Sequence, residues 1–201
     1  MSNTIVLASN NTGKIQEFNE MLNELGLEIK PQGEFNVEEI EETGLTFIEN
    51  AILKARNACA QTGLPAIADD SGIEVDFLDG APGIYSARFS GKHGDFDAHN
   101  ALILEKLDGV PVEKRTARFQ CVLAYMRHEN DPTPLVFQGT WEGSILTEIQ
   151  GKHGFGYDPL FYVADRDCSA AMLTKEEKNS ISHRSIALKQ LLDAFRKLNI
   201  L

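Results

Sequence analysis

The sequence has few cysteines and no long apolar run. Its three cysteines, Cys59, Cys121 and Cys168, are odd in number and widely spaced, so they fit neither a disulfide framework nor a zinc pattern. We expect buried free thiols in a reducing cytoplasm. No segment approaches the apolar length that spans a membrane, and residues 1–4 show no basic start of a signal peptide. These features predict a cytoplasmic protein without a membrane anchor.

Positive charge is also scarce. Nineteen lysines and arginines stand against 30 acids, which gives a formal net charge of −11. Such a chain is a poor candidate for binding nucleic acid through a broad basic face. It can still bind a small anion where a few cations and a metal ion converge. The 201 residues, 42% of them hydrophobic, suffice for a single domain over residues 1–201, with one large lobe or two closely joined lobes.

Residues 64–72 are the most informative stretch. A short apolar run enters two adjacent acids, Asp69 and Asp70, which are followed by Ser71 and Gly72. The pattern predicts a short buried strand that the Ser-Gly turn ends. Ligand sites in open α/β sheets lie just past strand ends, and two carboxylates facing each other there would repel unless a cation separates them. Carboxylates and water are the ligands that Mg²⁺ prefers. The alternative is an aspartate that caps a turn.

A polar loop, residues 9–14, follows a predicted strand over residues 4–8. After it, Ile15, Phe18, Leu22 and Leu25 recur at helical spacing, and Gly26 closes the predicted helix. The loop therefore offers free N–H groups, a helix dipole and the Lys14 charge to an anion. It is not a Walker loop, which needs other residues at two positions. The alternative is an ordinary helix that Asn10 or Asn11 caps.

Two further helices and a functional loop are predicted in the middle of the chain. Thr46 and Glu49 match a capping box, and the helix from Phe47 ends at Gly63. For Lys54 on this helix, the local sequence alone predicts a solvated surface position. Residues 73–77 alternate as a half-exposed strand that ends at a turn at residues 79–80. The long connection 81–94, which carries Arg88, is typical of a functional loop, and Asp95 predicts the N-cap of a helix reaching residue 107.

Residues 117–125 and 135–149 alternate as two long strands of an antiparallel hairpin, with Gly139 and Gly143 marking a bulge or bend. The sheet is therefore expected to be mixed. The following stretch, residues 151–159, places Phe155 between two glycines, where an exposed ring could stack on a flat ligand. The alternative is a plain turn with Phe155 folded inward.

The C-terminal part contains a charged helical turn at residues 174–179 and a last helix. His183 and Arg184 stand at the start of that helix, where the dipole disfavours positive charge. This placement makes sense if an anion or an electronegative ring edge binds between them. The expected buried face of the helix consists of Ile186, Leu188, Leu191, Leu192, Phe195 and Leu198.

Seven stretches carry a family resemblance: residues 9–14, 41–44, 47–54, 68–72, 80–88, 155–159 and 178–184. Through them the chain closely resembles the inosine triphosphate pyrophosphatase family, over almost its whole length and in the same order. Two positions depart from the family pattern. His153 stands where a glycine is usual, and Ser9 replaces the commoner threonine. Neither change removes a group that the chemistry needs.

The resemblance implies an α/β fold with an elongated mixed sheet flanked by helices, and two lobes with an active-site cleft between them. It implies a homodimer that requires Mg²⁺, whereas the charge and the lack of a long apolar run predict that the protein binds no nucleic acid or membrane. It also implies hydrolysis of non-standard purine nucleoside triphosphates, those of inosine, deoxyinosine and xanthosine, to the monophosphate and pyrophosphate. Two alternatives are a septum-inhibitor-type pyrophosphatase acting on modified pyrimidine nucleotides and a non-catalytic nucleotide sensor. The motifs at residues 155–158 and 182–184 argue against the first, and the intact acid pair argues against the second.

The resemblance further assigns roles to residues. Asp70 is the proton acceptor and a metal ligand, Glu42 is a second metal ligand, and Asp69 supports the acid pair. Lys54 and Arg88 are further phosphate contacts. The residues that hold phosphate are Ser9, Asn10, Asn11, Thr12, Gly13 and Lys14. Those that bind the rest of the substrate are Ser71, Phe155, Gly156, Tyr157, Asp158, Lys178, His183 and Arg184.

Overall fold

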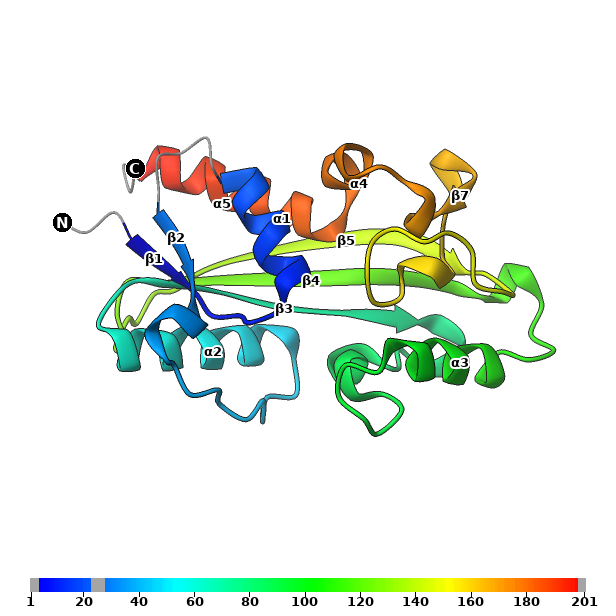
Figure 1. The fold of residues 1–201 in the computed structure, drawn as a ribbon, viewed down its shortest axis with the longest axis horizontal. Coiled ribbons are helices and arrows are strands. Elements are labelled where there is room, and N and C mark those ends of the chain that lie inside the picture. Colours follow the sequence, from blue (N-terminus) through cyan, green and yellow to red (C-terminus); the bar gives the residue numbers. More distant parts are fainter. Residues whose placement is uncertain (1–3, 23–27, 199–201) are drawn as a thin grey trace. The chain divides into compact units, whose positions relative to one another are not determined.

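The computed structural model describes residues 4–22 and 28–198 (Figure 1). These residues form a seven-stranded sheet in the order β2-β1-β3-β4-β5-β6-β7. β1 pairs in parallel with β2 and β3, whereas β6 pairs antiparallel with β5 and β7. The predicted mixed sheet is thus confirmed. Its strands are β1 (Thr4–Leu7), β2 (Glu28–Pro31), β3 (Ala66–Val75), β4 (Thr116–Met126), β5 (Leu135–Ile145), β6 (Phe161–Val163) and β7 (Cys168–Ser169).

The α-helices are α1 (Thr12–Leu22), α2 (Phe47–Thr62), α3 (Phe96–Lys106), α4 (Lys175–Ile181) and α5 (His183–Lys197). Their ends confirm the predicted caps. The Thr46 hydroxyl accepts a hydrogen bond from the Glu49 N–H at the start of α2, and Gly63 ends that helix in the left-handed conformation. Asp95 caps α3 through the Ala98 N–H. No described helix is long and apolar enough to cross a membrane.

The chain divides into two compact units. The first comprises Met1–Asp70, Cys121–Gly139 and Arg184–Leu201, and the second comprises Ser71–Gln120 and Thr140–His183. Three strands, β3, β4 and β5, contribute residues to both units. That residues 1–201 act as one domain, with a cleft between two lobes, stays a prediction.

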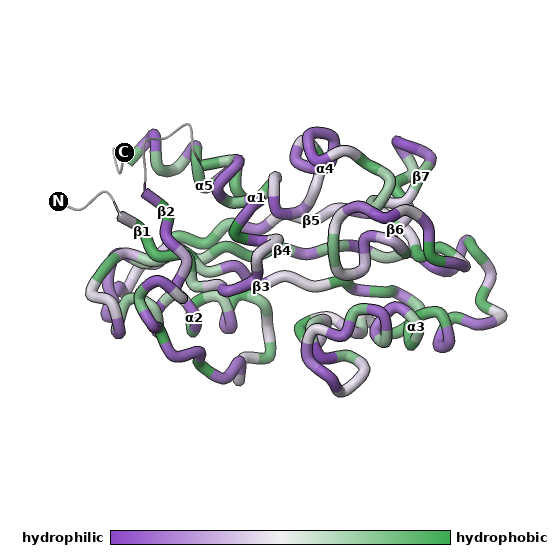
Figure 2. The backbone as a smooth tube through the Cα atoms, viewed as in Figure 1, coloured by the Kyte–Doolittle hydropathy of each residue, from purple (hydrophilic) through white to green (hydrophobic). Residues whose placement is uncertain are grey.

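In the first unit, alternate residues of each strand pack into two separate cores, one on each face of the sheet. Ile5 and Leu7 pack with α1 and α5, whereas Val6 and Ala8 pack with α2. The same parity continues on the neighbouring strands, because successive side chains of a strand point to opposite faces. Figure 1 shows α1 and α5 on one side of these strands and α2 on the other. Figure 2 shows hydrophobic stretches along the strands and a hydrophilic loop before α2.

The second unit has one core. It contains Ile73 and Val75 of β3, Ile103 of α3, and aromatic residues such as Phe119 and Phe161. The 3₁₀ segment Gly83–Arg88 lies in the long connection that the sequence marks as functional. The core therefore supports the connection 81–94 and the start of the glycine-rich stretch near residue 155, where Tyr157 is also a core member.

Several sequence-based expectations are wrong in detail. β3 does not end at Ser71 and Gly72 but continues through them to Val75, so the acids lie within a strand. β5 ends at Ile145 rather than at residue 149, and Leu198 is 56% exposed. Of the three free cysteines, Cys168 is only half-buried. The expected helix end at Leu25 and Gly26 lies outside the described residues.

Candidate active site

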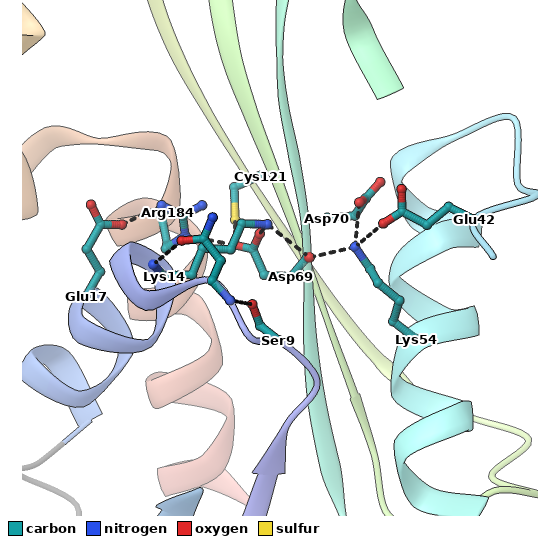
Figure 3. A network of polar contacts seen from close by, with 10 residues as sticks. Ser9, Lys14, Glu17, Glu42, Lys54, Asp69, Asp70, Cys121 and Arg184 are labelled. Atoms are coloured by element: carbon teal, nitrogen blue, oxygen red, sulfur yellow. Dashed lines mark hydrogen bonds and ion pairs between the residues drawn. The ribbon is translucent and has the colours of Figure 1, made fainter. Parts of the chain in front are cut away.

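Asp69 and Asp70 do not face each other. They are consecutive residues of β3, so their side chains leave opposite faces of the strand. Asp69 follows the parity of Ile67 and points to the side of α1 and α5; Asp70 follows Ala68 and points to the side of α2. Figure 3 shows the two carboxylates on either side of the strand, each with its own cations. The expectation that one cation separates two facing carboxylates is therefore wrong.

Asp69 is held by cations from two helices. One carboxylate oxygen contacts the Lys14 ammonium of α1, and Oδ2 accepts a hydrogen bond from Arg184 Nε of α5 at 2.8 Å. The Cys121 thiol of β4 donates to the same Oδ2 at 3.2 Å. The Arg184 guanidinium also contacts Glu17 of α1. Asp69 thus links β3 to α1 and α5 inside the first unit.

The charges around Asp69 determine its ionisation. Burial alone would raise the pKa of this carboxyl, but the Arg184 guanidinium and the Lys14 ammonium outweigh burial and hold the pKa well below its usual value. Burial likewise opposes the charge of Arg184, yet Asp69 and Glu17 raise the pKa of its guanidinium. Both groups remain ionised, because each buried charge lies against an opposite charge.

Asp70 lies among groups of the α2 side. Lys54 Nζ contacts Asp70 Oδ1 at 2.6 Å and Glu42 Oε1 at 2.8 Å, and it donates to the Asp69 carbonyl oxygen at 2.9 Å. The sequence alone suggested a solvated Lys54; that local expectation is wrong, because the side chain is only 17% exposed. The second oxygen of Asp70, Oδ2, is buried and has no hydrogen-bond partner in the described part of the chain.

The environment of Asp70 shifts its ionisation in the opposite direction to that of Asp69. Burial raises the pKa of Asp70 and the Glu42 charge adds to the rise, whereas the Lys54 ammonium opposes it. Two adjacent carboxyls thus have pKa values moved apart by their surroundings, a pattern typical of acid–base sites.

The donor set around Asp70 fits a divalent cation. The described residues contain no group of three His, Cys, Asp or Glu side chains that could hold a metal ion. Mg²⁺ needs no such group, because it is usually held by one or two carboxylates, waters and substrate phosphates. Glu42 and Asp70 supply two carboxylates, which Lys54 Nζ contacts at 2.8 Å and 2.6 Å.

The loop of residues 9–14 begins α1 as an ordinary capped helix. Asn11 Oδ1 accepts from the Lys14 N–H at 3.0 Å, and the Ser9 hydroxyl accepts from the Asn11 N–H at 3.1 Å. Thr12 and Gly13 are the first residues of the helix. The capping expectation for Asn11 is confirmed, whereas Asn10 instead donates to Glu39 at 2.8 Å. Phosphate binding by this loop stays a prediction.

A second group of predicted site residues lies in the second unit. Asp158 Oδ2 accepts from the Phe155 N–H at 2.8 Å and contacts Lys178 Nζ at 2.6 Å. The Lys178 ammonium also lies 4.7 Å from the centre of the Phe155 ring. Phe155 is half-buried rather than exposed. At Gly154, with φ +73°, an added Cβ would lie 2.1 Å from Asp158 Oδ2, so this turn requires glycine.

Other predicted residues of the second unit have structural contacts. The Tyr157 hydroxyl donates to the Ser86 carbonyl at 2.7 Å, and Gly156 accepts from Asn100 at 3.0 Å. The His183 ring stacks on Phe119 with centroids 4.7 Å apart. Two predicted residues lie elsewhere in this unit: Ser71, half-buried within β3, and Arg88, 5.1 Å from the centre of the Tyr85 ring.

Sequence reasoning missed two residues of the Asp69 cluster. Glu17 follows Lys14 by three residues, so helix geometry alone places them on one face. Cys121 could have been recognised from strand parity, because it alternates with Leu123 and Tyr125 of the same core. Arg184 contacts the two carboxylates of Asp69 and Glu17. Its expected contact with a ligand stays a prediction.

Comparison with known proteins gives consistent matches over nearly the whole chain. A family model described as the Ham1 family matches residues 5–194. The chain is 56% identical over 192 residues to a dITP/XTP pyrophosphatase of Photobacterium profundum, which covers 96% of this chain and 98% of the relative. It is 57% identical over 187 residues to a dITP/XTP pyrophosphatase of Vibrio parahaemolyticus, covering 93% and 94%. A solved HAM1 protein from Coxiella burnetii superposes with a TM-score of 0.90 at 50% identity, covering 96% of this chain and 98% of that one.

Proposed function

We propose the function of this chain from one premise: the chain belongs to the Ham1 family. It is a dITP/XTP pyrophosphatase, a hydrolase that acts on non-standard purine nucleoside triphosphates. The products are the nucleoside monophosphate and pyrophosphate. Such an enzyme removes altered purines from the nucleotide pool.

The observation that supports the chemistry best is the environment of Asp70. Its Oδ2 is buried and lacks a partner among the described residues, while Oδ1 is fixed by Lys54 at 2.6 Å. A carboxylate that is oriented at one oxygen and has no hydrogen-bond partner at the other can accept a proton from a water molecule. We assign this role to Asp70. The water oxygen attacks the α-phosphorus, the bond to the bridging oxygen breaks, and pyrophosphate leaves.

Glu42 and Asp70 are the residues that would hold Mg²⁺. When bound, the cation neutralises phosphate charge and stabilises charge on the leaving pyrophosphate. Lys54 lies between the two carboxylates and keeps them close together despite their like charge. A phosphate group that approached would compete for the same ammonium. Lys54 therefore holds the two acids and is also positioned to bind phosphate.

Phosphate binding is assigned to the start of α1. The helix begins at Thr12, directly after residues 9–11, so its first N–H groups and its positive dipole end are near the Lys14 side chain. In an acidic protein this local positive potential is the main attraction for a triphosphate. Arg88 is assigned as a further phosphate contact. The residues assigned to phosphate are Ser9, Asn10, Asn11, Thr12, Gly13 and Lys14.

Recognition of the purine is assigned to the second unit and the start of α5. The supporting contact is that of the Lys178 ammonium, which lies over one face of the Phe155 ring and contacts the Asp158 carboxylate that holds the turn. Ser71, Gly156, Tyr157, His183 and Arg184 complete the assignment. A homodimeric state and a cytoplasmic location belong to the same proposal.

The direct test is release of pyrophosphate from inosine triphosphate in the presence of Mg²⁺. The proposal expects equal amounts of inosine monophosphate and pyrophosphate, with little release from ATP. Preferred hydrolysis of modified pyrimidine nucleotides would instead support the septum-inhibitor type. Binding of inosine triphosphate without turnover would support a nucleotide sensor.

A further inference from the structure

Asn50 is a buried polar residue in the first turns of α2 that the proposed chemistry does not use. Its side chain is 0% exposed. Oδ1 accepts a hydrogen bond from the Gly44 N–H at 2.8 Å. Gly44 lies in the loop that precedes α2, two residues after Glu42. The amide therefore joins the helix to the backbone of the segment that carries a proposed metal ligand.

The close approach of the loop to the amide depends on glycine. A Cβ at Gly44 would lie 2.6 Å from Asn50 Oδ1 and 2.6 Å from the Cβ of Glu49, so the loop could not keep its position. Gly44 is not among the glycines with a positive φ. An alanine there would be opposed by these collisions and not by a left-handed backbone conformation.

The same face of α2 holds the loop at a second point. Lys54 follows Asn50 by four residues, one helical turn, so both side chains lie on one face. Lys54 Nζ contacts the Glu42 carboxylate at 2.8 Å. The segment of residues 42–44 is thus fixed at its side chain by Lys54 and at its backbone by Asn50.

The second amide atom of Asn50 supports a specific role. Nδ2 is buried and has no hydrogen-bond partner in the described part of the chain. The orientation of the amide is nevertheless fixed, because the Gly44 N–H needs an acceptor and only Oδ1 can accept. A buried donor without a partner, such as Asn50 Nδ2, lowers the stability of the fold. An apolar residue at this position would avoid that cost. Among the described residues, the Asn50 amide makes one hydrogen bond, which it accepts from the Gly44 N–H.

We propose that Asn50 is a positioning residue that sets the Glu42 carboxylate for the divalent cation by clamping the Gly44 backbone to α2. The proposal rests on the assignment of Glu42 and Asp70 as metal ligands. Asn50 itself touches neither substrate nor metal. Mutation of residues that orient metal ligands typically lowers metal affinity or activity by about 10- to 100-fold.

The test uses Mn²⁺ as the probe, with free Mn²⁺ followed by electron paramagnetic resonance in the absence of nucleotide. Asn50→Ala and Gly44→Ala are each expected to weaken Mn²⁺ binding by about tenfold. Because both break one clamp, the double variant is expected to be no weaker than either single variant. Asn50→Asp, which keeps the acceptor for Gly44, is expected not to weaken binding. The Mg²⁺ concentration for half-maximal hydrolysis of inosine triphosphate should shift in parallel.

Asn57→Ala is the matched control. Asn57 lies on the same helix and bonds the Glu38 carbonyl at 2.8 Å, so it also ties a loop to α2, but not the segment of Glu42. It is expected to leave Mn²⁺ binding unchanged. If Asn50→Ala fails to fold, Gly44→Ala carries the same test.

Unchanged Mn²⁺ binding in Asn50→Ala or Gly44→Ala would overturn the proposal, as would additive losses in the double variant. The Mn²⁺ titration needs no turnover, so it tests Asn50 even if the wild-type protein does not hydrolyse inosine triphosphate. That separate result would overturn the proposed function instead.

Discussion

Asp69 and Asp70 are adjacent in the chain, yet each contacts a separate set of cations on its own face of β3. Arg184 and Lys14 hold Asp69, whereas Lys54 holds Asp70. Strand geometry requires this separation, because consecutive residues alternate between faces. The two acids therefore have different roles. Asp69 joins α1 and α5 to the sheet, and Asp70 is the proposed general base.

Asp70→Asn is expected to lower the turnover of inosine triphosphate by about 10²- to 10⁴-fold, because the general base is lost. The change keeps the size and one oxygen of the side chain, so nucleotide binding should persist. Steady-state kinetics and equilibrium dialysis would measure the two effects. Asp97→Asn, an exposed acid on α3, serves as the control. A near wild-type rate in Asp70→Asn would remove Asp70 from the role of base.

Asp69→Asn is expected to reduce stability more than Asp70→Asn does. The variant removes the carboxylate that Lys14 contacts and leaves Arg184 with Glu17 alone. Removing one partner of a buried ion pair costs about 3–5 kcal/mol. Urea denaturation would measure the free energy of unfolding of both variants. Equal stability of Asp69→Asn and the wild type would show that the cluster around Asp69 is not structural.

The stability contributed by Asp69 should depend on pH in a defined direction. Its pKa is well below the unfolded value of about 3.9. Between the folded and unfolded pKa values the unfolded chain binds more protons, so stability rises with pH in that window. The contribution is fully present above about pH 4 and is lost as pH falls toward the folded pKa. The stability difference between the wild type and Asp69→Asn should therefore shrink on acidification below that pH. A difference that stayed constant or grew would contradict the assignment.

Lys14→Ala is expected to weaken binding of a triphosphate far more than binding of the nucleoside, because the lost ammonium pairs with phosphate. Calorimetric titration with inosine triphosphate and inosine would give both affinities. Lys30→Ala, which removes a half-buried lysine paired with Glu28, is the matched control. Equal losses for the two ligands would argue against a phosphate site at the start of α1. Because Lys14 also contacts Asp69, a loss of stability is expected alongside.

The choice between inosine and adenosine triphosphates is expected to depend on Arg184 and not on Phe155. Inosine presents an acceptor oxygen at C6 and adenine a donor amino group, so fixed donors favour inosine. We expect Arg184→Ala to lower the inosine-over-adenosine ratio of kcat/KM, and Phe155→Ala to lower both values about equally. Arg184 contacts Glu17, so Glu17→Gln is needed as a control that weakens this pair but keeps the guanidinium. An unchanged ratio in Arg184→Ala would shift the choice to backbone N–H groups.

Much of the fold was predictable because its signals are local. The N-caps at Thr46 and Asp95 and the strand signal of β4 each act within a few residues, and the structure confirms them. The alternation of burial in β4 holds only as far as Cys121, because the strand is buried on both faces beyond it. The end of β3 was not predictable in this way. Ser71 and Gly72 are turn formers by local preference, but pairing with neighbouring strands keeps them extended, a tertiary effect that overrides propensity.

The candidate site was predictable in its residue types but not in its pairings. The sequence places Lys54 on a helix and gives no reason for it to be buried; only the fold brings it within 2.6 Å of Asp70, which is 16 residues away. Arg184 and Asp69 are 115 residues apart, so no spacing rule links them. The role of Asn50 was missed because a buried asparagine in a helix has no local signature. Its partner is the backbone of Gly44, which sequence patterns do not describe.

The parity of β3 makes this strand intolerant of length changes. One residue inserted between Ala66 and Asp69 would exchange every later side chain between the two faces. Asp70 would then face α1 and α5, and the alternating hydrophobic residues of both cores would be displaced with it. A register shift of one would thus remove the site and disrupt the packing at once. A substitution in β3 changes one side chain at a time. The insertion of a single residue changes the face of every side chain that follows it.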